Sequence, residues 1–132
     1  MDTILNITKS MEGNVCVLHL AGRLDWQSEN SFVAYAQDEH KAGSSLLLLD
    51  LSQLTMLTSA GFRAIHVIFK LFTPRAEIEA WEKEHPDEPY KSAYFKLAGT
   101  SSEIYYALNI SGFLQNIPIY ANLAEGLASF KK

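Results

Sequence analysis

The alternation of apolar and polar positions predicts a β-hairpin at the start of the chain. Within residues 4–11 the apolar side chains Leu5 and Ile7 alternate with polar Asn6 and Thr8, and residues 15–21 are mostly apolar. The tripeptide Glu12-Gly13-Asn14 between them is a turn signal, and two such runs around a short turn are typical of paired strands. Gly22 is expected to end the second strand and to open a loop over residues 22–25.

The next apolar pattern has the period of a helix and is followed by a run typical of a buried strand. In residues 28–41 the apolar side chains fall on one side at helical spacing. Gly43 is expected to end this helix. Residues 46–49 are consecutive leucines, and a short apolar run after a glycine stop favours a strand buried on both faces. Residues 50–57 are expected to form a loop.

A second helix is predicted over residues 58–72. Its apolar side chains recur at helical intervals and include Phe62, Ile65, Ile68 and Phe69. Thr58 or Ser59 is suited to the N-cap, because a hydroxyl there can accept a hydrogen bond from a first-turn N–H group. The helix is expected to stop at Thr73-Pro74, since the residue before a proline avoids helical geometry.

The last part of the chain continues the alternation of strands and helices. Strands are expected at residues 94–97 and 117–120, and helices over residues 101–111 and from residue 122 onward. The buried side of the first of these helices is expected to carry Ile104, Tyr105 and Leu108. Helices that alternate with short apolar strands require crossover connections, so the pattern predicts an α/β fold with a mixed sheet covered by helices.

Residues 73–91 differ from the rest of the chain and are interpreted as an insert. They carry six acidic and three basic residues together with prolines at 86 and 89. A short polar helix over residues 76–84 is expected, with Ile78 and Trp81 on the side that docks on the domain. The insert has too little apolar surface for a core of its own, so it is expected to be a surface excursion.

Composition limits the class of protein. The chain has 132 residues, of which 48% are hydrophobic and 20% are charged, as in an ordinary globular protein. This length suits one domain over residues 1–132. The net charge of −4 and the dispersed basic residues argue against a nucleic-acid partner.

The cysteine content and the N-terminal sequence indicate in which cellular compartment the protein is expected. Cys16 is the only cysteine, so no intramolecular disulfide can form, and its apolar neighbours indicate a core position. The N-terminus lacks the basic and apolar regions of a signal peptide. No apolar run approaches the length that spans a bilayer, so a cytoplasmic protein without a membrane partner is expected.

One segment carries a more specific pattern than the others. Residues 48–62, Leu-Leu-Asp-Leu-Ser-Gln-Leu-Thr-Met-Leu-Thr-Ser-Ala-Gly-Phe, resemble the signature of STAS domains, the family of anti-sigma factor antagonists. In that signature a buried strand ends in Asp-Leu-Ser, and an apolar stretch leads to Asp-Ser-Ser/Thr-Gly-Leu at a helix start. Gly22-Arg23-Leu24-Asp25, Ala98-Gly99-Thr100-Ser101 and Ser111-Gly112-Phe113 resemble further family positions. The resemblance covers nearly the whole chain outside the insert.

The resemblance implies a fold, a function and a set of site residues. The fold would be a STAS-like mixed sheet of about five strands with packed helices. The function would be that of a phosphoprotein in transcription regulation, which binds an anti-sigma factor with serine kinase activity, or another STAS-binding signalling protein. The residue after the signature Asp is the phosphoacceptor, which falls on Ser59. Partner-binding residues would be Asp25, Thr58, Ser59, Ala60 and Gly61.

Two signature positions differ in this chain. Thr58 stands where the family has Asp, and Ala60 stands where it has Ser or Thr, while the acceptor hydroxyl of Ser59 is kept. A phosphate at a helix start is tolerated because free N–H groups favour an anion there. A constitutive scaffold or adaptor that is not phosphorylated stays an alternative, because the local carboxylate is missing.

A small hydrolase or ligand-binding domain that uses Ser59 is a further alternative. His66 lies seven residues along the predicted helix from Ser59, a rise of about 10 Å, whereas a nucleophile and its base lie about 3 Å apart. No Gly-x-Ser-x-Gly motif is present, and the histidines have no metal-ligand spacing. We therefore expect a binding protein that is not an enzyme and has no cofactor or metal.

Overall fold

The chain forms an α/β domain whose central feature is one five-stranded sheet. The computed structural model describes residues 4–112 and 115–131. The elements in chain order are β1 (Leu5–Glu12), β2 (Val15–Leu24), α1 (Glu29–Lys41), β3 (Leu46–Leu57), α2 (Ser59–Phe72), α3 (Arg75–Glu84), β4 (Phe95–Ala98), α4 (Ser102–Ser111), β5 (Ile119–Tyr120) and α5 (Leu123–Ala128).

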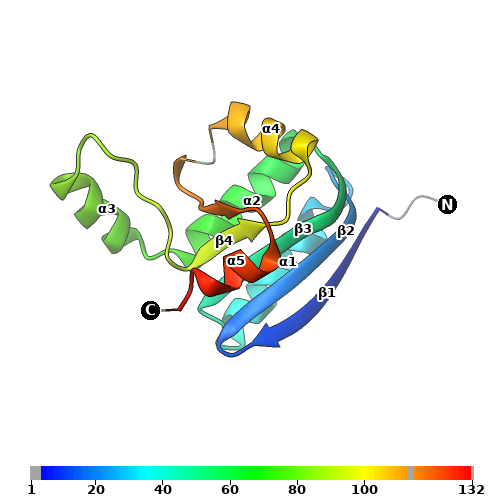
Figure 1. Cartoon of the computed structure of the whole chain (residues 1–132). Coiled ribbons are helices and arrows are strands. Elements are labelled where there is room, and N and C mark those ends of the chain that lie inside the picture. The colour runs from blue at the N-terminus through cyan, green and yellow to red at the C-terminus, as the bar shows by residue number, and fades with distance from the viewer. Residues whose placement is uncertain (1–3, 113–114, 132) are drawn as a thin grey trace.

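The strands lie in the sheet in the order in which they occur along the chain, β1-β2-β3-β4-β5. β1 and β2 form the predicted antiparallel hairpin, and each later strand is parallel to its neighbour. The sheet is therefore mixed, as the alternation of strands and helices predicted. The parallel strands end at the same edge of the sheet, so the loops after them meet at one end of the molecule (Figure 1).

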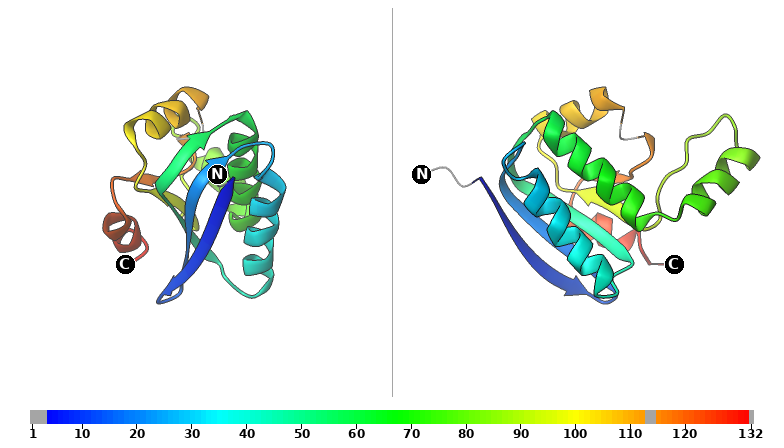
Figure 2. Two further views of the ribbon diagram at one scale, coloured as in Figure 1. Left: turned by 90° about the vertical axis from the view of Figure 1, so that its right-hand side faces the viewer. Right: turned by 180° about the vertical axis from the view of Figure 1, so that it is seen from behind.

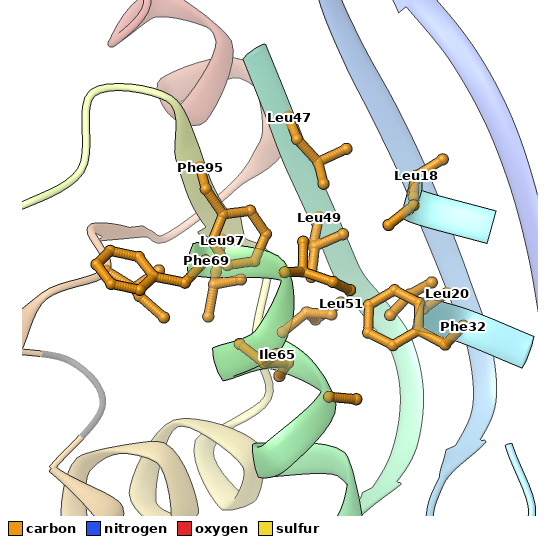
Figure 3. Packing of buried hydrophobic residues seen from close by; sticks show 14 of the residues in the cluster. Leu18, Leu20, Phe32, Leu47, Leu49, Leu51, Ile65, Phe69, Phe95 and Leu97 are labelled. Carbon is orange, nitrogen blue, oxygen red and sulfur yellow. The ribbon is translucent and has the colours of Figure 1, made fainter. Parts of the chain in front are cut away.

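Helices cover one face of the sheet and make the main core. Seen from behind, α1 and α2 lie side by side across β2 and β3 (Figure 2). Figure 3 shows Phe32 of α1 next to Leu20 of β2, and Ile65 of α2 near Leu51 of β3. These side chains are fully buried, as the apolar spacing of both helices required.

The opposite face of the sheet is covered only in part, by α5. Leu127 of α5 and Phe130, which follows this helix, pack with Leu48 in a smaller apolar cluster. Lys96 of β4 is buried there, and its Nζ donates to Ser129 O at 3.1 Å and lies 4.3 Å from the centre of the Phe130 ring. Burial lowers the pKa of Lys96. Leu47 and Leu49 are buried in the main core and Leu48 is buried in this smaller cluster, so β3 is buried on both faces as predicted for residues 46–49.

Two strands are longer than the sequence predicted. β2 continues through Gly22 to Leu24, and β3 continues to Leu57, so residues 50–57 are a strand and the prediction of a loop was wrong. The two extensions pair with each other after register shifts, for example Leu24 with Leu57. Gly22 has φ 111°, a value that favours glycine, so it serves a bulge and does not end the strand.

The insert extends away from the sheet as a helix and a return loop (Figure 1). The helix α3 has no fully buried residue, yet it is fixed to the body of the domain. Tyr90 and Tyr94 both donate from their hydroxyl groups to the Glu77 carboxylate. Trp81 stacks on His85 with ring centres 3.8 Å apart, and its Nε1 donates to Glu88 O at 3.0 Å. Ile78 and Trp81 are both partly buried against the main core, as expected.

Candidate functional site

The predicted acceptor Ser59 is the first residue of α2 and its side chain is exposed. Thr58 occupies the N-cap position, but its hydroxyl makes no cap hydrogen bond. Thr58 Oγ1 instead donates to Leu24 O at 3.4 Å, and the Thr58 N–H donates to the same carbonyl at 3.2 Å. The first turn of α2 also contains no acidic residue. The helix start around Ser59 therefore has neither a hydroxyl cap nor a carboxylate to offset its partial positive charge.

Gly61 allows the loop after β2 to approach the start of α2. A Cβ atom at this position would lie 2.7 Å from Leu24 O and 2.5 Å from a methyl carbon of Leu57. Leu24 O is a backbone atom, and it cannot move aside without shifting the loop that follows β2. Gly61 and Ala60 are both buried, so they shape the site from beneath Ser59.

Asp25 is buried and organises the loop between β2 and α1. Its Oδ1 accepts a hydrogen bond from the Gln27 N–H at 3.0 Å, and its backbone carbonyl accepts one from the Glu29 N–H at 2.9 Å. Ser28 Oγ accepts from the Asp25 N–H at 3.0 Å. Arg23 Nε lies 3.8 Å from Asp25 Oδ2. The carboxylate thus helps to hold the loop between β2 and α1 in shape.

Exposed apolar side chains gather at the same end of the molecule. Among the described residues, eight large apolar side chains are exposed, and six of them lie just before β1, in the loop after β2, near the end of β3 or on α4. We call these six the apolar end, and they are Ile4, Trp26, Met56, Tyr105, Tyr106 and Ile110. Isolated exposed apolar residues are ordinary, but several of them at one end of a molecule are typical of a protein-binding surface.

The helix α4 contributes more of this surface than the sequence predicted. Tyr105 was expected on the buried side, but it is 46% exposed and Tyr106 is 66% exposed. Ile104 and Leu108 face the core as predicted. Both tyrosines line a hollow of about 590 Å³ between the start of α4 and the end of β5. The helix is turned so that positions 104 and 108 fill the core, which leaves position 105 on the outer side.

A hydrogen-bonded chain of Ser10, His19 and Asp50 lies elsewhere, on the sheet. Ser10 Oγ lies 2.9 Å from His19 Nε2, and His19 Nδ1 lies 2.7 Å from Asp50 Oδ2. Burial acts to raise the pKa of Asp50, but hydrogen bonds from His19 and Ser52 outweigh it and hold that pKa below its usual value. Sequence reasoning missed this chain, because its members come from three strands and meet only through the register.

The Ser10 chain does not involve Ser59. Among the hydrogen bonds of the described residues, none joins Ser59 Oγ to a histidine or a carboxylate. His66 instead stacks on Phe69, with ring centres 6.0 Å apart. Within residues 4–112 and 115–131 there is also no group of three or more His, Cys, Asp or Glu side chains placed to hold a metal ion. None of the described helices has the length and apolar character needed to cross a membrane.

Solved structures of other proteins have the same fold. An anti-sigma factor antagonist from Mycobacterium paratuberculosis superposes with a TM-score of 0.78 at 13% identity, over 97% of this chain and 95% of that one. The phosphorylated form of the Bacillus cell fate determinant SpoIIAA gives 0.61 at 16% identity, over 93% and 97%. A sulfate transporter family protein from Wolinella succinogenes gives 0.65 at 17% identity, over 93% and 89%. At these identities the likeness shows the fold alone.

Sequence comparison identifies the family. The chain has no match among curated protein sequences. The model of the STAS domain family matches residues 6–78, which include Asp25, Ser59 and the whole of β3. This match covers more than half of the chain and agrees with the five-stranded mixed sheet and its helices. The chain therefore belongs to the STAS domain family.

Proposed function

We propose that the chain is an anti-sigma factor antagonist that works as a phosphoswitch, a binding module without catalytic activity of its own. Its unphosphorylated form binds an anti-sigma factor that has serine kinase activity. That partner transfers the γ-phosphoryl group of ATP to Ser59 Oγ, the bond to ADP breaks, and the hydroxyl proton leaves to a base of the kinase. Phosphorylation then releases the complex.

The observation that supports this proposal best is the position of the Ser59 hydroxyl. Ser59 is exposed at the first residue of α2, directly after β3, which carries Met56 of the apolar end. A kinase active site can reach an exposed hydroxyl at a helix start, and a partner can bury the side chains of the apolar end. Ser59 also falls on the acceptor position of the family signature.

The charge of a phosphate explains how such a site can switch. A phosphate at Ser59 would add about −1.5 to −2 charges at neutral pH. The N–H groups of the first turn stabilise this charge, so the fold is kept. A partner that buries the apolar end would have to desolvate the phosphate, which is costly unless the partner supplies cations. Release thus needs no large internal rearrangement.

The test uses a histidine-kinase-like ATPase with serine kinase activity as the candidate kinase. The protein and this ATPase are incubated with ATP, and the intact mass and the phosphopeptides are measured. We expect a mass increase of one phosphate, located on Ser59, and none for Ser59→Ala. Thr58→Ala is the control for the neighbouring hydroxyl and should still be phosphorylated. Phosphate on Thr55 or Thr58 with none on Ser59 would contradict the proposal.

A constitutive adaptor is the second candidate, and Thr58 is the observation that favours it. Thr58 replaces the family carboxylate, and its hydroxyl is directed to Leu24 O. If the kinase needs that carboxylate, wild-type protein will bind the partner without being phosphorylated. Thr58→Asp should then restore phosphorylation of Ser59. The same intact-mass measurement distinguishes the two candidates.

A further inference from the structure

Arg63 lies one helical turn after Ser59 on the same face of α2. Residues four apart on a helix have Cβ atoms about 5–6 Å apart, so their side chains can touch. The Arg63 side chain is 64% exposed and long enough to bend back toward the helix start. A guanidinium group presents a fork of N–H donors that matches the oxygens of a phosphate.

Arg63 already has one partner, Glu29 at the first position of α1. Its Nη2 donates to Glu29 Oε1 at 3.3 Å, and this contact links the starts of α1 and α2. A single contact of this length on an exposed guanidinium is a weak ion pair. It can therefore be exchanged for a stronger partner at little cost.

The other charged groups beside the site leave Arg63 available for this exchange. Arg23 lies near the end of β2, with Nε 3.8 Å from Asp25 Oδ2. The first turn of α2 has no carboxylate that would repel a phosphate or compete for Arg63. Glu29 is thus the carboxylate that a phosphate on Ser59 would have to displace.

We propose that Arg63 binds the phosphate on Ser59 within the same chain, and that phosphorylation moves Arg63 from Glu29 to the phosphate. This regulation rests on the proposed phosphorylation of Ser59. The exchange places two hydrogen bonds between guanidinium and phosphate, in addition to the N–H groups of the first turn. Glu29 loses its partner and becomes a free carboxylate at the start of α1. A partner protein therefore meets a changed charge at two positions, Ser59 and Glu29.

The test places phosphoserine at position 59 by codon suppression, so that no kinase is required. The pKa of the phosphate's second ionisation is measured by ³¹P NMR titration. An adjacent cation favours the doubly charged form, so we expect this pKa to be about half a unit or more lower with Arg63 than in Arg63→Gln. Glu29→Gln removes the competitor and should lower the phosphate pKa further or leave it equally low.

Lys70→Gln is the matched control, because it removes one positive charge from the last turn of the same helix. It should leave the phosphate pKa unchanged, and circular dichroism should show that each variant is folded. Equal phosphate pKa values in the wild type and Arg63→Gln would overturn the inference. The two proposals can also fail separately. If the phosphate pKa depends on Arg63 but no kinase phosphorylates Ser59, the proposed function is rejected and the pairing of Arg63 with the phosphate stands.

Discussion

At the scale of residues, the start of α2 lacks a side chain at position 61, a capping hydroxyl and a carboxylate. Gly61 has no side chain, so the Leu24 carbonyl can approach the helix. That carbonyl takes the hydrogen bonds of Thr58, which leaves the first turn uncapped. An uncapped helix start without a carboxylate is open to an added anion.

Gly61→Ala should destabilise the protein by about 1–3 kcal/mol, the usual cost of overpacking. The added Cβ would lie 2.7 Å from Leu24 O. Urea unfolding measures the change. Gly126→Ala is the comparison, because its Cβ would meet mainly the movable methyl groups of Leu48 at 3.1 Å and it should cost clearly less. Equal costs for the two variants would show that the loop after β2 yields easily.

Ser59→Asp should stabilise the protein by about 0.3–1 kcal/mol, because it supplies the missing negative charge at the helix start. Ser59→Asn is the neutral control of similar size. The difference between the two in urea unfolding should shrink at high salt, since salt screens exposed charges. If Asp is no better than Asn at low salt, the helix start is already compensated and the anion argument is wrong.

At the scale of elements, the insert is built more firmly than its composition suggested. The sequence predicted the helix and the docking of Ile78 and Trp81, because both follow from local spacing. It did not predict that Tyr90 is buried in the main core, or that Glu77 accepts from two tyrosines. Those contacts join residues 13 and 17 positions apart, and no local pattern encodes them.

Replacing residues 75–89 by a short Gly-rich turn should leave the domain folded. Lost docking of Trp81 should lower the free energy of unfolding by about 1–3 kcal/mol, while the change in loop length matters little. A longer replacement that also removes Tyr90 should cost about 3 kcal/mol more, since a large side chain leaves the core. Urea unfolding compares the two, and failure of the shorter replacement to fold would make α3 part of the core.

The pKa of Tyr90 is raised by burial and by its hydrogen bond to Glu77. The folded pKa exceeds the unfolded value near 10, so the environment of the Tyr90 hydroxyl contributes to the free energy of unfolding as long as the phenol is protonated. This contribution is complete below about pH 10 and is lost as the pH rises toward the folded pKa. Tyr90→Phe should be about 1 kcal/mol less stable than wild type at pH 8. This difference in the free energy of unfolding between the two proteins should be smaller at pH 11. A gap that stays constant across this range would contradict the assigned environment of Tyr90.

At the scale of the whole molecule, the candidate site lies at the end where the parallel strands stop. Open α/β sheets commonly bind ligands there. The sequence predicted the location of Ser59, because the buried strand, the turn and the helix start are all local signals. It missed the extended part of β3, since Ser52, Gln53 and Thr55 look like loop residues and are held in a strand only by pairing with β2. The exposure of Tyr105 depends likewise on how α4 docks.

Met56→Ala should weaken binding to the partner kinase by roughly tenfold, as expected for a side chain near the centre of an interface. Met11→Ala is a closely matched control, because Met11 is 49% exposed and Met56 is 47% exposed, at opposite ends of the sheet. Calorimetry with the unphosphorylated protein measures both affinities. Equal losses for the two variants would place the partner on another surface.

The chain has two tryptophans, one at the apolar end and one in the insert. Each is an intrinsic fluorescent probe of its own surroundings. Trp26 is strongly exposed in the loop between β2 and α1, whereas Trp81 is stacked on His85 within the insert. The emission of Trp26 should be red-shifted and open to quenching by iodide, and that of Trp81 should be shielded. Single-tryptophan variants can therefore report occupancy of the apolar end and opening of the insert as separate signals, without any attached dye.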